Sequence, residues 1–314
     1  MISLAATLAM CPCFCRLCRA WRSAPEKTAR PCWPCRSALS IDEEVAAPPP
    51  PPPPVFDEAA VAAATRGLYT YIAHMLPSRD VAEEEKEYEE ASDAVIATFT
   101  LRQEQIGPLK QLVQAKAAEE GKTPPHCSTV VVAYALAWVC HVRARGHPSH
   151  KTAHFGFTAS CRGRLTPPAP DSYFGNCILP CIAEAKVEDL VGPDGFVAAA
   201  QAVGRAVDEF KSSDVMRCME RWREKIPAVM AEGAVVTVAG SPRFKVYNVD
   251  FGWGRPKKVD LMTIRKSRAI SLADSREEEG GVEIGVVLPK SEMDEFGNHF
   301  ISGLESNIGC KFDC

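Results

Sequence analysis

Asp250-Phe251-Gly252-Trp253-Gly254 is the stretch that decides the fold of this chain, because the combination is improbable by chance and few families carry it. Its two glycines permit backbone angles that other residues avoid, and its two aromatic side chains are predicted to fill a core. Asp250 is expected to pair with a buried cation or to cap a turn. We interpret the five residues as a structural signature rather than as a set of catalytic residues.

The composition predicts a soluble globular protein, since 314 residues that are 46% hydrophobic can bury one large core or two modest ones. A net charge of -4, with no long basic cluster, argues against nucleic acid or an anionic membrane surface as a partner. The sequence has no apolar run of about 18 residues, which excludes a transmembrane helix on length.

The first 54 residues differ in composition from the rest of the chain. Six of the 14 cysteines fall within residues 11–35 and could bind zinc as thiolates, but their irregular spacing and the interleaved Pro and Arg favour an unstructured leader without metal. Pro48–Pro54 is predicted to be a stiff polyproline II spacer, because consecutive prolines donate no backbone hydrogen bonds. We therefore expect residues 1–54 to be a disordered leader and the eight later cysteines to be reduced core thiols.

Helical and strand patterns alternate over the rest of the sequence, which predicts an α/β fold with a mixed sheet. Helices are predicted at residues 57–73, 102–120, 128–144, 196–212, 216–230 and 290–304. Strands are predicted at residues 94–101, 154–160, 234–239, 261–264 and 281–288. Residues 83–90 are expected to be an exposed acidic stretch, and residues 173–183 to contain a tight turn at Gly175-Asn176.

From Val55 to about Ser306, the order of the motifs resembles that of the plant BAHD acyl-CoA-dependent acyltransferases. The motifs are Val55-Phe56-Asp57, Ser92-Asp93 with the strand at 97–101, Cys127-Ser128-Thr129 leading to Trp138-Val139-Cys140, and then Asp250 to Gly254. Residues 162–168 and 173–177 are similar to the branch that acylates, and often malonylates, anthocyanins and phenolic glucosides.

The resemblance implies the chloramphenicol acetyltransferase-like fold of that family, in which two similar α/β domains enclose a channel. It divides this chain into the leader (1–54), a remnant of the first domain with its crossover (55–125) and the second domain (126–314), so that the first domain is incomplete. It also implies an enzyme that transfers an acyl group, with malonyl as one candidate, from acyl-CoA to a hydroxyl of a flavonoid or phenolic glycoside. Acyl-CoA is then a co-substrate and no cofactor is permanently bound; we expect a cytoplasmic monomer.

Enzymes of the family use a His-x-x-x-Asp motif, whose histidine takes the proton of the acceptor hydroxyl. None of the seven histidines here is followed by Asp four residues later. By resemblance the motif falls upstream of Val55, so we expect an N-terminally truncated, impaired enzyme with no catalytic residue in this chain. Neither His74 nor His126 is predicted to replace the base. The alternatives are a non-catalytic fragment that binds coenzyme A or a partner protein, and a fragment that does not fold.

Coenzyme A carries phosphates and a pantetheine arm, so its groove requires cations and helix amino termini beside an apolar channel. Ser128 and Thr129 follow Pro124-Pro125 at a helix start and are one candidate group, with N-capping as the alternative role of Ser128. A second candidate group, with surface or turn roles as the alternative, follows a strand: Ser160, Arg162, Arg164 and Asn176. Arg255, Lys257 and Lys258 are expected on a solvated face.

Overall fold

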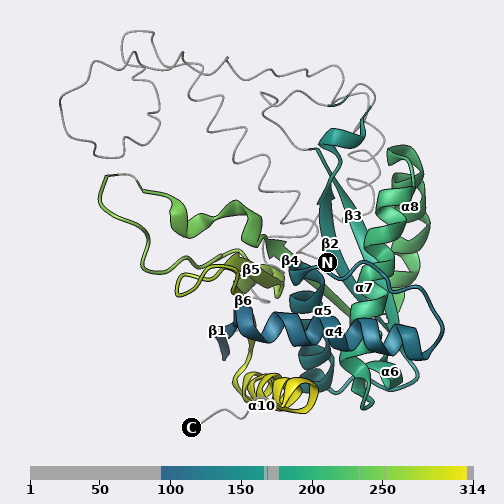
Figure 1. Ribbon diagram of the computed structural model, residues 1–314, viewed down its shortest axis with the longest axis horizontal. Helices are drawn as coiled ribbons and strands as arrows, with labels where there is room; N and C mark the ends of the chain where they lie inside the picture. The colour runs from purple at the N-terminus through teal and green to yellow at the C-terminus, as the bar shows by residue number, and fades with distance from the viewer. Residues whose placement is uncertain (1–92, 166–167, 169–176, 233, 251, 310–314) are drawn as a thin grey trace, which may run out of the picture.

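A computed structural model of the chain describes residues 93–165, 168, 177–232, 234–250 and 252–309 (Figure 1). The expected leader, the helix at 57–73 and the acidic stretch at 83–90 lie outside these residues. The mixed α/β architecture predicted from the alternating patterns is confirmed. Among the helices of the described segments, none combines the length and the apolar character that crossing a membrane requires.

The sheet of the described residues contains six strands in the order β1-β6-β5-β4-β2-β3. The strands are β1 (Ala94–Leu101), β2 (Thr152–Ser160), β3 (Ile178–Lys186), β4 (Val235–Gly240), β5 (Ile270–Asp274) and β6 (Val282–Pro289). The central pairs β2–β4 and β4–β5 are parallel, and the outer pairs β1–β6, β5–β6 and β2–β3 are antiparallel. The sheet is therefore mixed, with β1 and β3 at its two edges.

One strand was placed wrongly from the sequence. Residues 261–264 form no strand: they lead into the short helix α9 (Ile264–Ser267), and the strand of this region is β5. Leu261 and Ile264 instead pack with Val287 in a small separate cluster, whereas Met262 is exposed. The apolar run is a turn anchored by two side chains, and β5 already occupies the place between β4 and β6.

Helix α5 (Thr129–Arg145) is the centre of the core. All twelve residues from Val131 to Val142 are buried, as expected for a helix that is apolar around its whole circumference and is covered on every side. Its cover is formed by the sheet and by four helices: α4 (Gln103–Glu119), α6 (Val187–Val191), α7 (Gly195–Ser212) and α10 (Lys290–Ile308). Trp138 and Tyr134 of α5 pack against Phe155 of β2, with ring centroids 5.6 and 5.1 Å apart.

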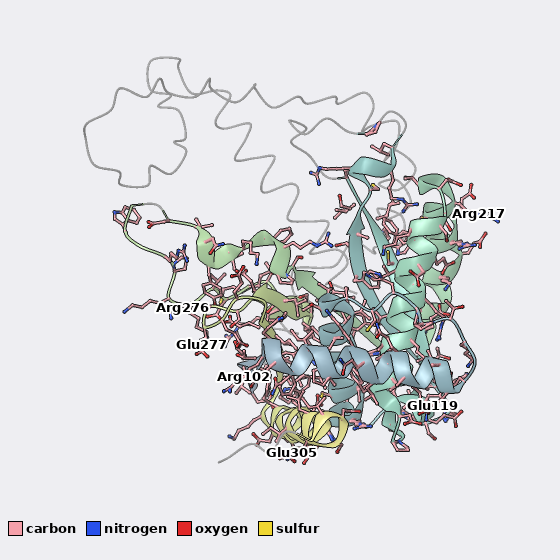
Figure 2. The ribbon with its side chains drawn as sticks, viewed as in Figure 1. Arg102, Glu119, Arg217, Arg276, Glu277 and Glu305 are labelled. Carbon is pink, nitrogen blue, oxygen red and sulfur yellow. The ribbon has the colours of Figure 1, made fainter. Side chains whose placement is uncertain are left out.

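Local sequence explains where α4 and α5 begin and end. At the start of α4, the buried Gln105 side chain accepts the backbone N–H of Arg102 at 2.9 Å, which satisfies a donor that precedes the helix. Figure 2 shows Arg102 and Glu119 at the two ends of this helix. Helix α5 ends at Gly146, whose φ of 59° is the left-handed conformation that glycine adopts at low cost.

The remaining helices complete the fold around the β3 edge. Helix α6 (Val187–Val191) follows β3 directly, and α8 (Val215–Glu232) packs beside β3 near α7 (Figure 1). Strand β1 and helix α4 share the sheet and core with the elements that follow residue 126. The division of the chain into two family domains near residue 125 stays a prediction.

The segment between β4 and α9, residues 241–263, is an excursion from the sheet (Figure 1). It contains two short 3-10 helices, η2 (Pro242–Phe244) and η3 (Val246–Asn248), and is otherwise irregular. Two hydrogen bonds tie its base to the sheet: Tyr247 Oη donates to Glu283 Oε2 at 2.7 Å, and the Val246 N–H donates to Asp274 Oδ1 at 3.0 Å. We call this segment the 241–263 excursion.

Candidate functional site

The amino end of α5 carries the first predicted group, Ser128 and Thr129. Ser128 is the N-cap, as expected, and its Oγ accepts the N–H of Val131 at 3.4 Å. The hydroxyl of Thr129 accepts a hydrogen bond from Lys110 Nζ of α4 at 3.0 Å. A lysine ammonium therefore lies beside the helix end where the amide dipoles already favour an anion.

His126, two residues before the N-cap, lies against the carboxyl end of α7. Its backbone N–H donates to Asp208 Oδ2 at 2.8 Å, while its ring Nδ1 is 3.0 Å from Lys211 Nζ. Because an ammonium can only donate, Nδ1 is the acceptor in this contact. The pKa of His126 is lowered, first by partial burial and then by Lys211; Asp208 opposes this decrease, and Arg243 and Lys110 add smaller contributions to it. The Asp208 carboxylate is therefore close to His126, but its hydrogen bond is to the backbone N–H and not to the imidazole ring.

Gly204 of α7 explains how the segment before α5 comes so close to α7. A Cβ atom at this position would lie 2.5 Å from the His126 carbonyl oxygen and 3.0 Å from Pro125 Cβ. Contacts of 2.5 Å do not occur with real Cβ atoms, so any other residue would push the segment outward. The absence of a side chain at Gly204 is therefore a requirement for the position of His126.

The second predicted group follows β2. Ser160 is the exposed last residue of that strand, and Arg162 and Arg164 belong to the 3-10 helix η1 (Arg162–Arg164). The guanidinium of Arg164 lies over the Phe210 ring, 4.2 Å from its centroid, and its Nη2 donates to the carbonyl oxygen of Ser213. Asn176, the last member of the predicted group, lies outside the described residues.

The carboxyl end of α7 contacts two segments that are far apart in sequence. Asp208 and Lys211 contact His126 ahead of α5, while Phe210 and the C-cap residue Ser213 contact Arg164 behind β2. Of the predicted residues, Arg164 therefore lies against this helix end, and His126 links the same end to the segment that precedes Ser128.

Three cations at this place were not found from sequence: Lys110 of α4, Lys211 of α7 and Arg243 of η2. Each occupies an ordinary surface position in its own element, so only the packing of α4, α7 and η2 around α5 identifies it. Among the described residues, no group of three or more His, Cys, Asp or Glu side chains is placed to hold a metal ion.

The signature Asp250 to Gly254 is a tight turn in the 241–263 excursion. Asp250 Oδ1 accepts the N–H groups of Gly252 at 2.7 Å and of Gly254 at 3.0 Å, which confirms the turn-capping role expected for it. Both glycines have positive φ, 96° and 93°, where other residues are strained. Phe251 lies outside the described residues.

The prediction that the aromatic side chains of the signature fill a core is wrong for Trp253, which is 93% exposed. The reason is local: the two positive-φ glycines on either side of it turn the chain so that the indole leaves the described body. Arg255, Lys257 and Lys258 are exposed, as expected, and Lys258 pairs with Asp260 at 3.2 Å.

The fold defines the class of protein. Over 65% of this chain and 46% of the other, the structure is similar to the crystal structure of vinorine synthase, with a TM-score of 0.50 at 22% identity. This likeness confirms the expected α/β fold of the acyltransferases that resemble chloramphenicol acetyltransferase.

The family follows from the sequence match. A family model described as the Transferase family matches residues 44–302, and the chain belongs to this family, that of the BAHD acyltransferases. Phenolic glucoside malonyltransferase 2 of Arabidopsis thaliana is 38% identical over 215 residues, covering 68% of this chain and 47% of that protein. The malonyl-coenzyme A:anthocyanin 3-O-glucoside-6''-O-malonyltransferase of Dahlia pinnata is 34% identical over 229 residues, covering 69% and 47%. The chain spans about half the length of these curated relatives.

Proposed function

We propose that this chain is the acyl-CoA-binding part of an O-acyltransferase that acylates a hydroxyl of a phenolic or flavonoid glycoside, with malonyl-CoA as the first donor to test. Membership of the family and the two relatives named for malonyl transfer to glucosides support this proposal. A cytoplasmic monomer that binds no nucleic acid is part of the same proposal. Light scattering that gives the mass of two chains would contradict the monomer.

The observation that carries the proposal is the gathering of cations at the amino end of α5. Lys110, Lys211 and Arg243 come from three different elements, and the amino end of α5 adds the positive end of its helix dipole. Coenzyme A presents phosphates, for which clustered cations and a helix amino terminus are a suitable environment. Ser128, Thr129, Ser160, Arg162, Arg164 and Asn176 remain the proposed contacts of the ligand.

Transfer requires the acceptor oxygen to attack the thioester carbonyl, the carbon–sulfur bond to break, and the acceptor proton to move to a base. No His-x-x-x-Asp motif stands in this sequence, so the chain does not contain the base that the family motif supplies. Loss of a general base typically costs a factor of about 10² to 10⁴ in rate. We therefore expect the isolated chain to bind acyl-CoA but to turn over very slowly.

A second candidate function is binding without catalysis, which the missing motif favours. The two functions differ in one assay: the chain is mixed with malonyl-CoA and a phenolic glucoside, and the release of free coenzyme A thiol is followed. Release well above the rate without protein would contradict our account of the missing base. Release at background, together with measurable binding of coenzyme A, supports the non-catalytic alternative for this chain on its own.

Binding itself is tested by calorimetric titration of the chain with coenzyme A. We expect Lys211→Ala to weaken binding roughly three- to tenfold, because it removes one cation from the phosphate environment. Lys257→Ala removes an equal charge from the exposed part of the excursion and is the matched control, expected to bind as the wild type does. Pantetheine, which lacks the phosphates, should bind more weakly than coenzyme A. Absence of both heat and a shift of the melting temperature with coenzyme A would refute the proposal.

A further inference from the structure

Two cysteines face each other where the β2–β3 hairpin begins to open. The antiparallel register of these strands runs as far as the pair Ser160 and Ile178, so Cys161 and Cys177 are the next opposed pair. The Cys161 N–H donates to the Cys177 carbonyl oxygen at 2.9 Å, and the two Sγ atoms are 3.3 Å apart. Both side chains are buried, with exposed fractions of 4% and 8%.

This arrangement meets the geometric requirement for a disulfide. Directly opposed residues in an antiparallel pair have Cα atoms about 4.5–5.5 Å apart, which is within the range of about 4.4–6.8 Å that disulfides span. A bonded sulfur pair is about 2.05 Å apart, so the sulfur atoms have to approach by roughly 1.2 Å from their present contact, a movement that side-chain rotation provides. We propose that Cys161 and Cys177 are a redox pair that forms a reversible disulfide under oxidising conditions.

With glutathione disulfide as the oxidant, the chemistry balances in two exchange steps. A thiolate of the pair attacks one sulfur of glutathione disulfide, which forms a mixed disulfide and releases one glutathione. The second cysteine then attacks the protein sulfur of the mixed disulfide and releases the second glutathione. Two protein thiols are oxidised, one glutathione disulfide is reduced, and the two protons leave on the two glutathione molecules. In a reducing compartment the two cysteines are thiols most of the time, and a disulfide that forms between them is soon reduced again.

The surroundings of the two thiols make the reaction depend on pH. Burial raises the pKa of Cys161 to about 12, and the neighbouring Cys177 thiol contributes to the same increase. Because the thiolate is the reactive form, the disulfide should form slowly at neutral pH and faster at higher pH.

The oxidised chain should also be more stable to heat. The bond would link positions 16 residues apart and so restrict the unfolded chain, an effect that grows with the length of the closed loop. The native hairpin already holds the two residues opposite each other, so little rearrangement opposes the gain. We expect the melting temperature of the oxidised chain to exceed that of the reduced chain by several degrees.

The test uses the whole folded chain, incubated in buffers of increasing glutathione disulfide to glutathione ratio. Peptide mapping without reduction should find a peptide in which Cys161 is linked to Cys177, and dithiothreitol should remove it. In Cys161→Ser and in Cys177→Ser the linked peptide should be absent, and the remaining cysteine should carry glutathione instead.

The proposal is overturned if peptide mapping of the wild-type chain finds Cys161 and Cys177 unlinked under conditions in which other cysteines of the chain have been oxidised. Because this mapping needs no variant, it decides the matter even if a serine substitution prevents folding.

Discussion

Helix α5 and the 241–263 excursion differ both in how distinctive their sequences are and in how deeply their side chains are buried. The helix has an ordinary apolar sequence, yet its residues 131–142 are buried and the sheet and four helices pack around it. The excursion contains the most distinctive five residues of the chain, yet its tryptophan is exposed and a few hydrogen bonds hold its base. A rare motif therefore identifies the family without being the energetic centre of the described fold.

The largest expected difference comes from one substitution made in each region. Trp138→Ala removes a fully buried side chain in contact with Phe155, and should lower the free energy of unfolding by about 3–5 kcal/mol. Trp253→Ala removes an indole that is 93% exposed, and should change it by less than about 0.5 kcal/mol. Urea denaturation followed by circular dichroism measures both. Equal decreases in the free energy of unfolding for the two variants would contradict the contrast between the helix and the excursion.

A buried histidine in α5 makes the stability of the helix depend on pH. Burial lowers the pKa of His141 to about 3, with Arg145 and His147 adding to the effect, and its Nδ1 has no hydrogen-bond partner among the described residues. The unfolded chain takes up this proton near pH 6.5, where the folded chain does not, so the free energy of unfolding falls as the pH decreases from about 6.5 to 3. The loss from this residue should reach roughly 2 kcal/mol between pH 6.5 and pH 5.

The His141 contribution is isolated by comparing variants over the same pH range. His141→Leu cannot titrate, so its stability should fall less steeply with acid than that of the wild type. His150→Gln changes an exposed histidine and should keep the wild-type slope. If His141→Leu and the wild type lose stability in parallel between pH 6.5 and pH 5, His141 is not the group responsible.

Two helix glycines, Gly204 of α7 and Gly107 of α4, should change the stability in opposite directions when replaced by alanine. At Gly204 the added Cβ would meet the His126 carbonyl oxygen at 2.5 Å, and Gly204→Ala should destabilise the chain by roughly 1–2 kcal/mol and weaken coenzyme A binding. At Gly107 of α4 nothing lies within 4 Å of the added Cβ, and Gly107→Ala should stabilise by roughly 0.5–1 kcal/mol. Thermal melting of both variants gives the signs. A Gly204→Ala chain as stable as wild type would show that the close approach is not required.

The smallest expected effect is local to the excursion. Asp250→Ala removes the acceptor of two backbone N–H groups, and should cost about 1 kcal/mol or less because the turn is exposed. Hydrogen exchange at Gly252 and Gly254 is the sensitive measurement, and both amides should exchange faster than in the wild type. Asp250→Asn keeps an acceptor oxygen and should largely preserve their protection. Unchanged exchange in Asp250→Ala would mean that other contacts hold the turn.

Helix α5 and the six-residue strand β4 were predictable from their apolar patterns, whereas strands β3 and β5 were not. Helix α5 was placed within a residue at each end because Ser128 caps it and its apolar run is long. Strand β5 was missed because it has only five residues, Ile270–Asp274, and its existence depends on strands β4 and β6 on either side. The apolar run at 261–264 misled the prediction, since Ile264 is buried and Leu261 is partly buried without any strand pairing.

In the candidate site, too, some residues could be identified from the local sequence and others only from the packing of distant elements. The position of Ser128 and Thr129 at the start of α5 was predictable because a helix start is a local feature of the sequence. Lys110, Lys211 and Arg243 were not, because their proximity depends on how three separate elements pack around α5. The contact of Arg164 with Phe210 is likewise between residues far apart in sequence, and no local sequence pattern predicts it.

The pairing of β1 with β6 has a consequence for the synthesis of this protein. Ala94 of β1 pairs with Pro289 of β6, so this pairing cannot form until the ribosome has synthesised residue 289. At about 5–20 residues per second, that wait is roughly 10 to 40 s. During this time β1 has no partner along its β6 side, and nascent chains are most prone to aggregation in such a state. Chaperone capacity on the ribosome, more than final stability, is then expected to limit the yield of folded protein.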